Sequence, residues 1–453
     1  MPIVSETIYQ QLEDRIDAEY YKPEYLASEK LLSEYKKIKC LGEIVHSFAN
    51  GVEIRDFVDD GVPYIRVSDT NREFFVDISK TAFIRKNDAD KVKKKVALEI
   101  GDILTNRSGT LGFSHIVTEE IKNSIISSHI IRLSDISNDI NPYFIVAFLN
   151  SKYGRLQILR RNNGAVVPEI NQPALKSVVV PIPPKPFQEK IEKLVKEAHA
   201  KRTLTNQKYK EAEELLYKEL RIDKLELRQD KTFETTFSDV DKNMRFDSEY
   251  YQPKCNEVKS RLDELSNNYD VVELKKIANL TTGKQQETFK ELTGGVPFYS
   301  IKDIEQSSFS NADFRYIKKD DHKRMKNSAL RTNDVLLAIT GATIGKTGIF
   351  LENAGNISGD LARIRMKEGV NPFYVLIYLE SLFGQLQINQ YIYGATNKHL
   401  SLKSVENIMV PIIPKPKQEE ISNLIKDSFK LRKESKLLLD EAKQKVEDLI
   451  EKE

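Results

Sequence analysis

The chain has 453 residues, more than one hydrophobic core usually supports, so we expect roughly two to four domains. Its 70 Lys and Arg against 68 Asp and Glu leave a formal net charge of +2, and its pI is near 8.1. Nucleic-acid-binding domains often have a pI above about 9, so composition alone does not indicate DNA binding.

Two cysteines, Cys40 and Cys255, are too few for a disulfide framework or a cysteine metal site, which favours a reducing compartment. No apolar run approaches about 18 residues, and the N-terminal stretch lacks the apolar core of a signal peptide. We therefore expect a cytoplasmic protein with no membrane span.

An internal repeat organises the chain, and its anchors lie 230 residues apart. A proline-rich strap, VPIPPKPFQ at Val180–Gln188, returns as VPIIPKPKQ at Val410–Gln418. The box RIDAEYYKP at Arg15–Pro23 returns as RFDSEYYQP at Arg245–Pro253. Between these anchors the spacing shifts by a few residues, which indicates one scaffold carrying two different sets of loops.

Each copy reads in the same order along the chain. In the first copy we expect strands over 41–45, 62–67, 125–133 and 175–182, and a strand over 101–112 that runs into a Gly/Ser/Thr loop. Asn141-Pro142 predicts a helix start, since Asn caps and Pro suits the first turn, with the helix ending near residue 152.

A long charged helix of about 35 residues follows each strap, starting near Phe187 and Lys417. A seven-residue apolar pattern predicts a coiled coil, in which the two helices pack antiparallel and bury their stripes on each other. The alternative is that each helix packs only on its own domain. The core positions are small or apolar: Ile191, Ala198, Thr205 and Ala212 in the first helix, and Ile421, Ser428, Ser435 and Ala442 in the second.

These patterns predict an α+β protein with an internal pseudo-twofold repeat, in which two mixed α/β globular domains are joined by two long antiparallel helices. The expected boundaries are 1–186 for the first globular domain, 187–226 for the first helical spacer, 227–416 for the second globular domain and 417–453 for the second spacer.

Three motifs resemble catalytic signatures and fail in detail. GATIGKT at Gly341–Thr347 has three residues between its glycines, whereas a phosphate-binding loop needs four before GK[ST]. NPYF at Asn141 and NPFY at Asn371 lack the second proline of the adenine-methyltransferase motif. The six histidines are scattered without metal spacing. We therefore predict no catalytic residues and no metal site.

Basic and amide side chains concentrate in the loops of both copies. Arg, Lys and Asn are the residue types that contact base edges and phosphates, so we take some of these positions as candidate DNA-binding residues. The alternative for each is an ordinary solvated surface. The candidates are Arg66, Asn71, Arg72, Asn106, Arg107, Arg160 and Arg161 in the first copy, and Lys302, Lys346, Asn397 and Lys398 in the second.

The order and spacing of the doubled box, glycine loop, strap and long helix resemble the specificity subunit of type I restriction–modification systems. The resemblance covers nearly the whole chain. The strap departs in one detail, since Gln188-Glu189 and Gln418-Glu419 stand where the family usually has a Glu-Gln pair.

The resemblance implies two target recognition domains that each read one half of a split, asymmetric double-stranded DNA site. It implies helical spacers that set the gap, two docked methyltransferase subunits and, optionally, two restriction subunits. The chain itself would catalyse nothing, and S-adenosylmethionine, ATP and Mg²⁺ would belong to the partners. The alternatives are the specificity chain of a system with a fused methylase–nuclease, a chain with its own methyltransferase, and a coiled-coil scaffold that does not read DNA.

Overall fold

The computed structural model describes residues 15–70, 74–79, 81–164, 166–224, 227, 232–284, 295–305, 308–309, 315–394 and 397–452. The chain forms two compact units. Unit 1 holds residues 1–203 and 431–453, and unit 2 holds residues 204–430. Each unit therefore combines one globular part with half of each long helix.

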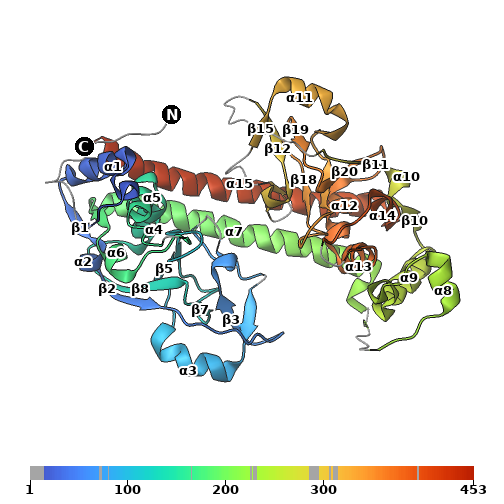
Figure 1. Cartoon of the computed structure of the whole chain (residues 1–453), viewed down its shortest axis with the longest axis horizontal. Coiled ribbons are helices and arrows are strands. Elements are labelled where there is room, and N and C mark those ends of the chain that lie inside the picture. Colours follow the sequence, from blue (N-terminus) through green and yellow to red (C-terminus); the bar gives the residue numbers. More distant parts are fainter. Residues whose placement is uncertain are drawn as a thin grey trace. The chain divides into compact units, whose positions relative to one another are not determined.

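Unit 1 contains a four-stranded antiparallel sheet in the order β2-β8-β5-β6, a three-stranded sheet β4-β3-β7 and the pair β1-β9 (Figure 1). Its strands are β1 Ile38–Cys40, β2 Val45–Asn50, β3 Val62–Ile65, β4 Ala82–Ile84, β5 Ile103–Asn106, β6 Ser114–Ile116, β7 Ile125–Ile126, β8 Ile130–Ile136 and β9 Val179–Pro181. Its helices are α1 Pro23–Ser33, α2 Leu41–Ile44, α3 Lys86–Val96, α4 Pro142–Asn150, α5 Lys152–Arg160, α6 Gln172–Lys176 and the first half of α7 Lys185–Leu220.

Unit 2 has the corresponding sheets β11-β20-β17-β18 and β15-β12-β19-β16 and the pair β10-β21, with one further strand, β16, in the second sheet and a further pair, β13-β14. Its strands are β10 Asp270–Glu273, β11 Ala278–Thr282, β12 Val296–Tyr299, β13 Ile304–Glu305, β14 Ser308–Phe309, β15 Arg315–Ile317, β16 Ala329–Leu330, β17 Val335–Ala338, β18 Thr347–Ile349, β19 Gly355–Ile357, β20 Leu361–Met366 and β21 Met409–Ile412. Its helices are α8 Phe237–Asn243, α9 Pro253–Leu265, α10 Leu274–Ile277, α11 Lys319–Arg324, α12 Pro372–Glu380, α13 Leu382–Gln390, α14 Leu402–Glu406 and the first half of α15 Lys415–Glu451.

The predicted helix start at Asn141 is confirmed, and it recurs at Asn371. Each Asn side chain accepts a hydrogen bond from the backbone N–H two residues on, at 2.9 Å and 3.0 Å, and proline occupies the first turn. The helices that follow, α4 and α12, are buried over most of their length and form the centre of each unit's core.

Three of the expected strands are wrong in extent. Residues 41–44 form the helical turn α2, because Leu41 and Ile44 lie three apart and both are buried, and the strand begins only at Val45. The expected strand over 125–133 is split at residues 127–129, where Ile130 N–H donates to Ser127 O in a turn. Residues 172–176 form α6, which leaves only Val179–Pro181 extended before the strap.

The two long helices pack antiparallel within each unit, as predicted, so the alternative in which each packs only on its own domain is wrong. In unit 1 the Ser435 hydroxyl donates to Ala198 O at 2.8 Å, and Lys201 pairs with Glu434 at 2.8 Å. In unit 2 the Thr205 hydroxyl donates to Ser428 O at 3.3 Å. Small residues at these positions let one backbone come within reach of the other helix's side chains. All eight predicted core positions are buried.

The repeated strap glutamine joins each strap to its domain. Gln188 Oε1 accepts from Asn141 N–H at 2.7 Å, while its Nε2 donates to Pro183 O at 2.8 Å. Gln418 makes the equivalent bonds to Asn371 N–H at 3.0 Å and to Ile413 O at 2.8 Å. Both side chains are buried, so these bonds satisfy polar groups that water cannot reach.

The repeated box forms a clasp around a loop of its own unit. Arg15 pairs with Asp17 at 2.7 Å and donates to Asn162 O at 2.7 Å, and the Tyr21 hydroxyl donates back to Arg15 O at 2.6 Å. In unit 2, Arg245 pairs with Asp247 and donates to Ile392 O in the same way. The box that is repeated in the two copies thus has a structural role, because it holds a loop in each unit.

Candidate nucleic-acid interface

Four segments of unit 1 meet beyond the end of β5, and we call them loop cluster 1: residues 66–70, 106–112, 127–129, and 162–164 with 166–170. Arg107 N–H donates to His129 O at 2.9 Å, and Ile170 N–H donates to Arg107 O at 2.8 Å. The Asn106 amide donates to the Thr70 hydroxyl at 2.8 Å. The β5–β6 loop is therefore the centre on which the other three segments are assembled.

Unit 2 assembles equivalent segments around the β17–β18 loop, and we call them loop cluster 2: residues 300–304, 338–345, 358–360, and 392–394 with 397–400. Ile339 N–H donates to Asp360 O at 2.9 Å, and Leu400 N–H donates to Ile339 O at 2.8 Å. Ile339 thus takes the place of Arg107. The backbone arrangement is the same in both clusters and the side chains differ.

Charged side chains in loop cluster 1 are arranged in pairs. Arg107 forms an ion pair with Glu169 and exposes 24% of its side chain, and Arg66 pairs with Asp69 at 3.2 Å and lies over the Phe57 ring. Hydrogen bonds from Ser128 and then Arg55 lower the pKa of the nearby Glu53 carboxyl, which keeps it ionised. Such pairs hold each guanidinium in place.

Loop cluster 2 presents its candidate residues differently. Lys302, Asn397 and Lys398 are exposed, and Gly341 N–H donates to Lys398 O at 3.0 Å, which fixes the backbone from which the lysine extends. Lys346 is half-buried and lies at the far end of the glycine loop, beside β18.

The remaining candidates fall outside loop cluster 1. Arg160 is 3% exposed, pairs with Glu29 of α1 and donates to Tyr20 O at 3.0 Å. Arg161 pairs with the same Glu29 at 2.9 Å. Both guanidinium groups fasten α5 to α1, so we leave them out of the DNA-contacting set. Asn71 and Arg72 lie outside the described residues.

The glycines of the central loops have two separate roles. Gly112 and Gly345 have φ of +75° and +94°, and a Cβ at either would lie 2.4 Å from Ile158 or 2.7 Å from Gln385. They let each loop pack against α5 or α13. Gly341 has φ of +84° and open space around it. The loop that resembled a phosphate-binding motif is thus bound to a helix of its own unit.

Sequence reasoning missed two residues of these clusters, His129 and His399. His129 Nδ1 lies 2.7 Å from the Ser108 hydroxyl, and His399 Nδ1 lies 3.1 Å from the Thr340 hydroxyl. The histidines were considered only as metal ligands. The available signal was their position directly before an apolar residue, Ile130 or Leu400, at the edge of a loop.

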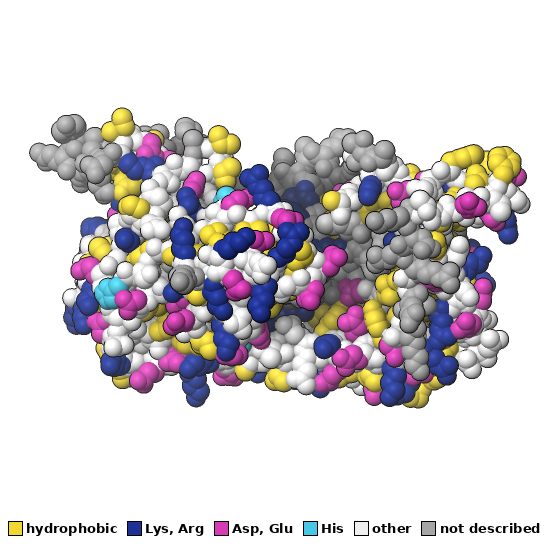
Figure 2. All heavy atoms as spheres, turned by 90° about the horizontal axis from the view of Figure 1, so that it is seen from below, with side chains coloured by type: hydrophobic (Ala, Val, Ile, Leu, Met, Phe, Trp, Pro, Cys, Tyr) yellow, Lys and Arg dark blue, Asp and Glu magenta, His cyan; other side chains and the backbone are white. Residues whose placement is uncertain are grey.

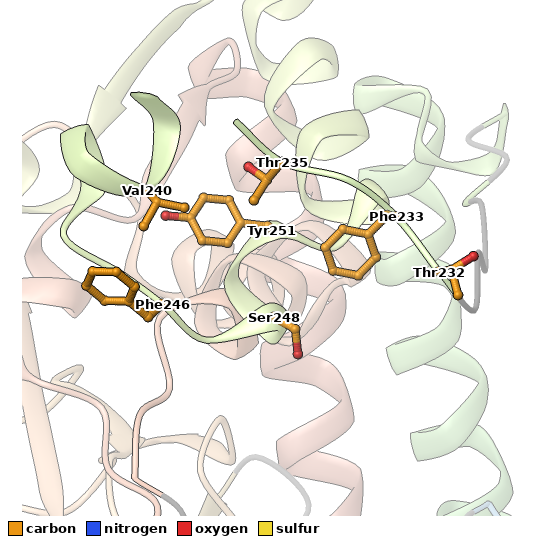
Figure 3. A pocket seen from close by; sticks show the side chains of 7 residues that line it. All are labelled: Thr232, Phe233, Thr235, Val240, Phe246, Ser248 and Tyr251. Carbon is orange, nitrogen blue, oxygen red and sulfur yellow. The ribbon is translucent and has the colours of Figure 1, made fainter. Parts of the chain in front are cut away.

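A pocket of about 410 Å³ in unit 2 lies within residues 232–251, apart from loop cluster 2. Figure 3 shows Phe233, Tyr251 and Thr235 around it, with Phe246 and Ser248 at its margin. Its lining carries no charged side chain. Over the face that Figure 2 presents, basic and acidic side chains are interspersed, in keeping with the small net charge.

Within the described ranges, no group of His, Cys, Asp and Glu is placed to hold a metal ion. None of the described helices combines the length and the apolar character needed to cross a membrane.

Comparison with known proteins decides the family. A family model described as the type I restriction modification DNA specificity domain matches residues 33–214 and 266–440, once in each copy of the repeat. The chain belongs to this family. It is a type I DNA specificity subunit of a non-catalytic family, and the cofactors of such systems reside in the modification and restriction subunits.

Relatives of this specificity subunit align over different lengths. The putative MjaX specificity subunit of Methanocaldococcus jannaschii is 24% identical over 459 aligned residues, covering 95% of this chain and 97% of the relative. The EcoBI specificity subunit of Escherichia coli is 30% identical over 141 residues, which span 31% of this chain and 30% of that subunit. The structure of the S subunit from M. genitalium aligns with a TM-score of 0.46 and 14% sequence identity. The alignment covers 91% of this chain and 96% of the M. genitalium chain.

The family match confirms the predicted resemblance, fold class and function. It favours the type I assignment over the fused methylase–nuclease system, the self-contained methyltransferase and the scaffold that does not read DNA. A specificity subunit of this kind works in an assembly with other subunits.

Proposed function

We propose that each loop cluster reads one half of a split, asymmetric double-stranded DNA site. One observation carries the proposal: the same backbone assembly recurs in both units with different side chains at equivalent places. Arg107, flanked by His129 and Glu169, corresponds to Ile339, flanked by Asp360 and His399. A homodimer would present identical surfaces and read a palindrome, whereas these two surfaces suit two unrelated half-sites.

We assign DNA contacts to Arg66, Arg107, Lys302, Asn397 and Lys398, with Lys346 at the margin, and a positioning role to Asn106. Asn106 is buried and donates to the hydroxyls of Thr70 and Thr110 at 2.8 Å each, so its part is to position the loop. The Arg and Lys side chains have the length and donors to reach base edges or phosphates.

The proposed partners are two methyltransferase subunits and, where present, two restriction subunits, which bring S-adenosylmethionine, ATP and Mg²⁺. The setting is the cytoplasm. Support for two methyltransferase subunits comes from the repeat itself, because a duplicated scaffold with duplicated straps and helices offers a partner two equivalent positions. The domain boundaries 1–186, 187–226, 227–416 and 417–453 remain the proposed functional division.

Exchange of residues 20–160 for those of another type I specificity subunit tests the proposal. The chimera, assembled with its methyltransferase subunits, should methylate a site with one altered and one unchanged half. Exchange of the equivalent region of the second copy is the matched control and should alter the other half. If both halves of the site changed in either chimera, the proposal that each domain reads one half-site would be contradicted.

A further inference from the structure

Each loop cluster contains one imidazole whose orientation is fixed. In loop cluster 1, His129 is exposed, its backbone oxygen accepts from Arg107 N–H at 2.9 Å, and its Nδ1 lies 2.7 Å from the Ser108 hydroxyl. Ser108 is only 8% exposed. The buried hydroxyl therefore holds one side of the ring, and the edge that carries Nε2 is left toward solvent.

Loop cluster 2 holds its imidazole from a different segment. His399 exchanges two backbone hydrogen bonds with Tyr393, at 3.0 Å and 2.8 Å, and its ring meets the Tyr393 ring edge-on with centroids 5.5 Å apart. The Thr340 hydroxyl lies 3.1 Å from His399 Nδ1. Thr340 follows Ile339 as Ser108 follows Arg107, so the fixing hydroxyl comes from the same place in both clusters.

The two positions that flank the central loop have exchanged residue types. The segment before β8 ends in His129, and the equivalent segment before β20 ends in Asp360. The other flank carries Glu169 in unit 1 and His399 in unit 2, each directly before the residue that donates to the central loop. Each cluster thus presents one imidazole and one carboxylate, in opposite order, around a common hydroxyl.

The hydroxyl contact is compatible with a ring that donates from Nε2. A serine or threonine hydroxyl rotates freely and can donate to Nδ1, which leaves the ring proton on Nε2. Among the described residues, none makes a hydrogen bond with Nε2 of His129 or His399. An oriented donor, exposed at His129 and half-buried at His399, suits an acceptor on DNA, such as guanine O6 or N7 or a phosphate oxygen.

We propose that His129 and His399 are specificity-determining residues, each held by Ser108 or Thr340 so that its Nε2 donates a hydrogen bond to the DNA. This inference rests on the proposed function of the loop clusters. The exchange of histidine and carboxylate between the flanks makes the donor approach its half-site from opposite sides of the central loop in the two units.

The test uses the specificity subunit in complex with its methyltransferase subunits and selects bound sequences from a library randomised at both half-sites. Histidine 129 is replaced in two ways. In His129→Asn the amide reaches only the place of Nδ1, and in His129→Gln it reaches the place of Nε2. His399→Asn and His399→Gln are the matched pair in unit 2. In each variant, an unchanged preference at the half-site of the unaltered unit shows that this unit is still folded.

His129→Asn should lose about 5-fold to about 100-fold in preference at one position of its own half-site, with the second half-site unchanged, and His129→Gln should lose less. An equal loss for all sequences would identify the acceptor as a phosphate and would overturn the specificity-determining role. Wild-type preferences in both Asn variants would overturn this inference alone. Absence of any half-site preference in the wild-type complex would overturn the proposed function with it.

Discussion

At the scale of single residues, two of the candidate arginines lie in different surroundings. Arg107 lies in loop cluster 1 with part of its side chain exposed, and Arg160 is buried between α5 and α1. Arg107→Ala should weaken DNA binding by about 1–3 kcal/mol if the guanidinium contacts a base, with discrimination relaxed at one position.

Arg160→Ala is the matched comparison, because it removes the same charge from the same unit. It should lower the free energy of unfolding, since Glu29 and Tyr20 O lose their buried partner, and leave the relative affinities for different half-sites unchanged. Binding titrations on a set of single-base variants separate the two effects. A change of sequence preference in Arg160→Ala would place that residue in the interface after all.

The strap glutamine offers a second test at this scale. Gln188→Ala removes a buried side chain that bonds Asn141 N–H and Pro183 O, and it should destabilise unit 1 by about 1–3 kcal/mol. Gln207→Ala, on the exposed face of the same helix, should change stability by less than about 0.5 kcal/mol. Urea unfolding of both variants measures the difference, and equal midpoints would show that the strap bonds contribute nothing.

Residue-level prediction succeeded where the pattern is local. The eight positions singled out in the long helices are all buried, because a seven-residue period is visible within one helix. The ion pairs of Arg160 and Arg161 could not be predicted, because their partner, Glu29, is more than a hundred residues away in sequence. His129 and His399 were missed because the histidines were considered only as metal ligands, and their hydroxyl partners belong to other loops.

At the scale of elements, α7 packs on unit 1 through a titratable side chain. The His199 ring lies 4.8 Å from the Phe75 ring, and burial, with Arg202 nearby, lowers the pKa of His199 despite the opposing carboxylate of Glu120. As pH falls through about 6.5, the unfolded chain takes up a proton that the folded chain resists, so stability is lost on acidification. His199→Gln should flatten the stability profile between pH 7 and 5, measured by thermal unfolding, and an unaltered slope would refute this origin.

The central glycine loop gives a matched pair of substitutions. Gly341→Ala strains a left-handed backbone in open space and should cost about 1–2 kcal/mol. Gly345→Ala adds a clash with Gln385, whose Nε2 donates to Gly345 O at 2.9 Å, so it should cost more. Denaturant unfolding compares them. A smaller loss in Gly345→Ala would show that the contact between the loop and α13 is easily adjusted.

Elements were predicted well where one signal dominates and poorly where short segments compete. The Asn-Pro helix starts and the first residues of both long helices, Lys185 and Lys415, match the expectation to within two residues. Residues 41–44 and 172–176 are single helical turns of four and five residues, too short for any period to show. Their conformation follows from tertiary burial of Leu41, Ile44 and Leu175.

At the scale of the whole molecule, the antiparallel helices are expected to set the gap between the half-sites. Insertion of seven residues into both α7 and α15 keeps the register and lengthens each helix by about 10 Å. That length corresponds to roughly three base pairs of B-DNA, so selection from a library of variable gaps should yield a wider preferred gap with the same bases at each end.

Insertion into one helix alone is the control. It should disrupt pairs such as Ser435 with Ala198 O and Thr205 with Ser428 O, and lower stability without defining a new gap. In the double insertion, roughly three additional base pairs also rotate one half-site about the DNA axis relative to the other by about a third of a turn. The assay therefore measures the spacing of the half-sites in bound sequences instead of activity. An unchanged preferred gap in the double insertion would show that the helices do not set the distance.

The division of unit 1 between residues 1–203 and 431–453 bears on the order in which the molecule is made. During translation the first globular part leaves the ribosome long before the last residues of its core are synthesised. These residues are Leu439, Ala442, Val446 and Ile450. Until then Tyr153 and Lys152 lack Glu451 and Glu447, their partners at 2.6 Å. At about 5–20 residues per second, this apolar face stays open for tens of seconds, so the nascent chain is most exposed to proteases and chaperones in its oldest segment.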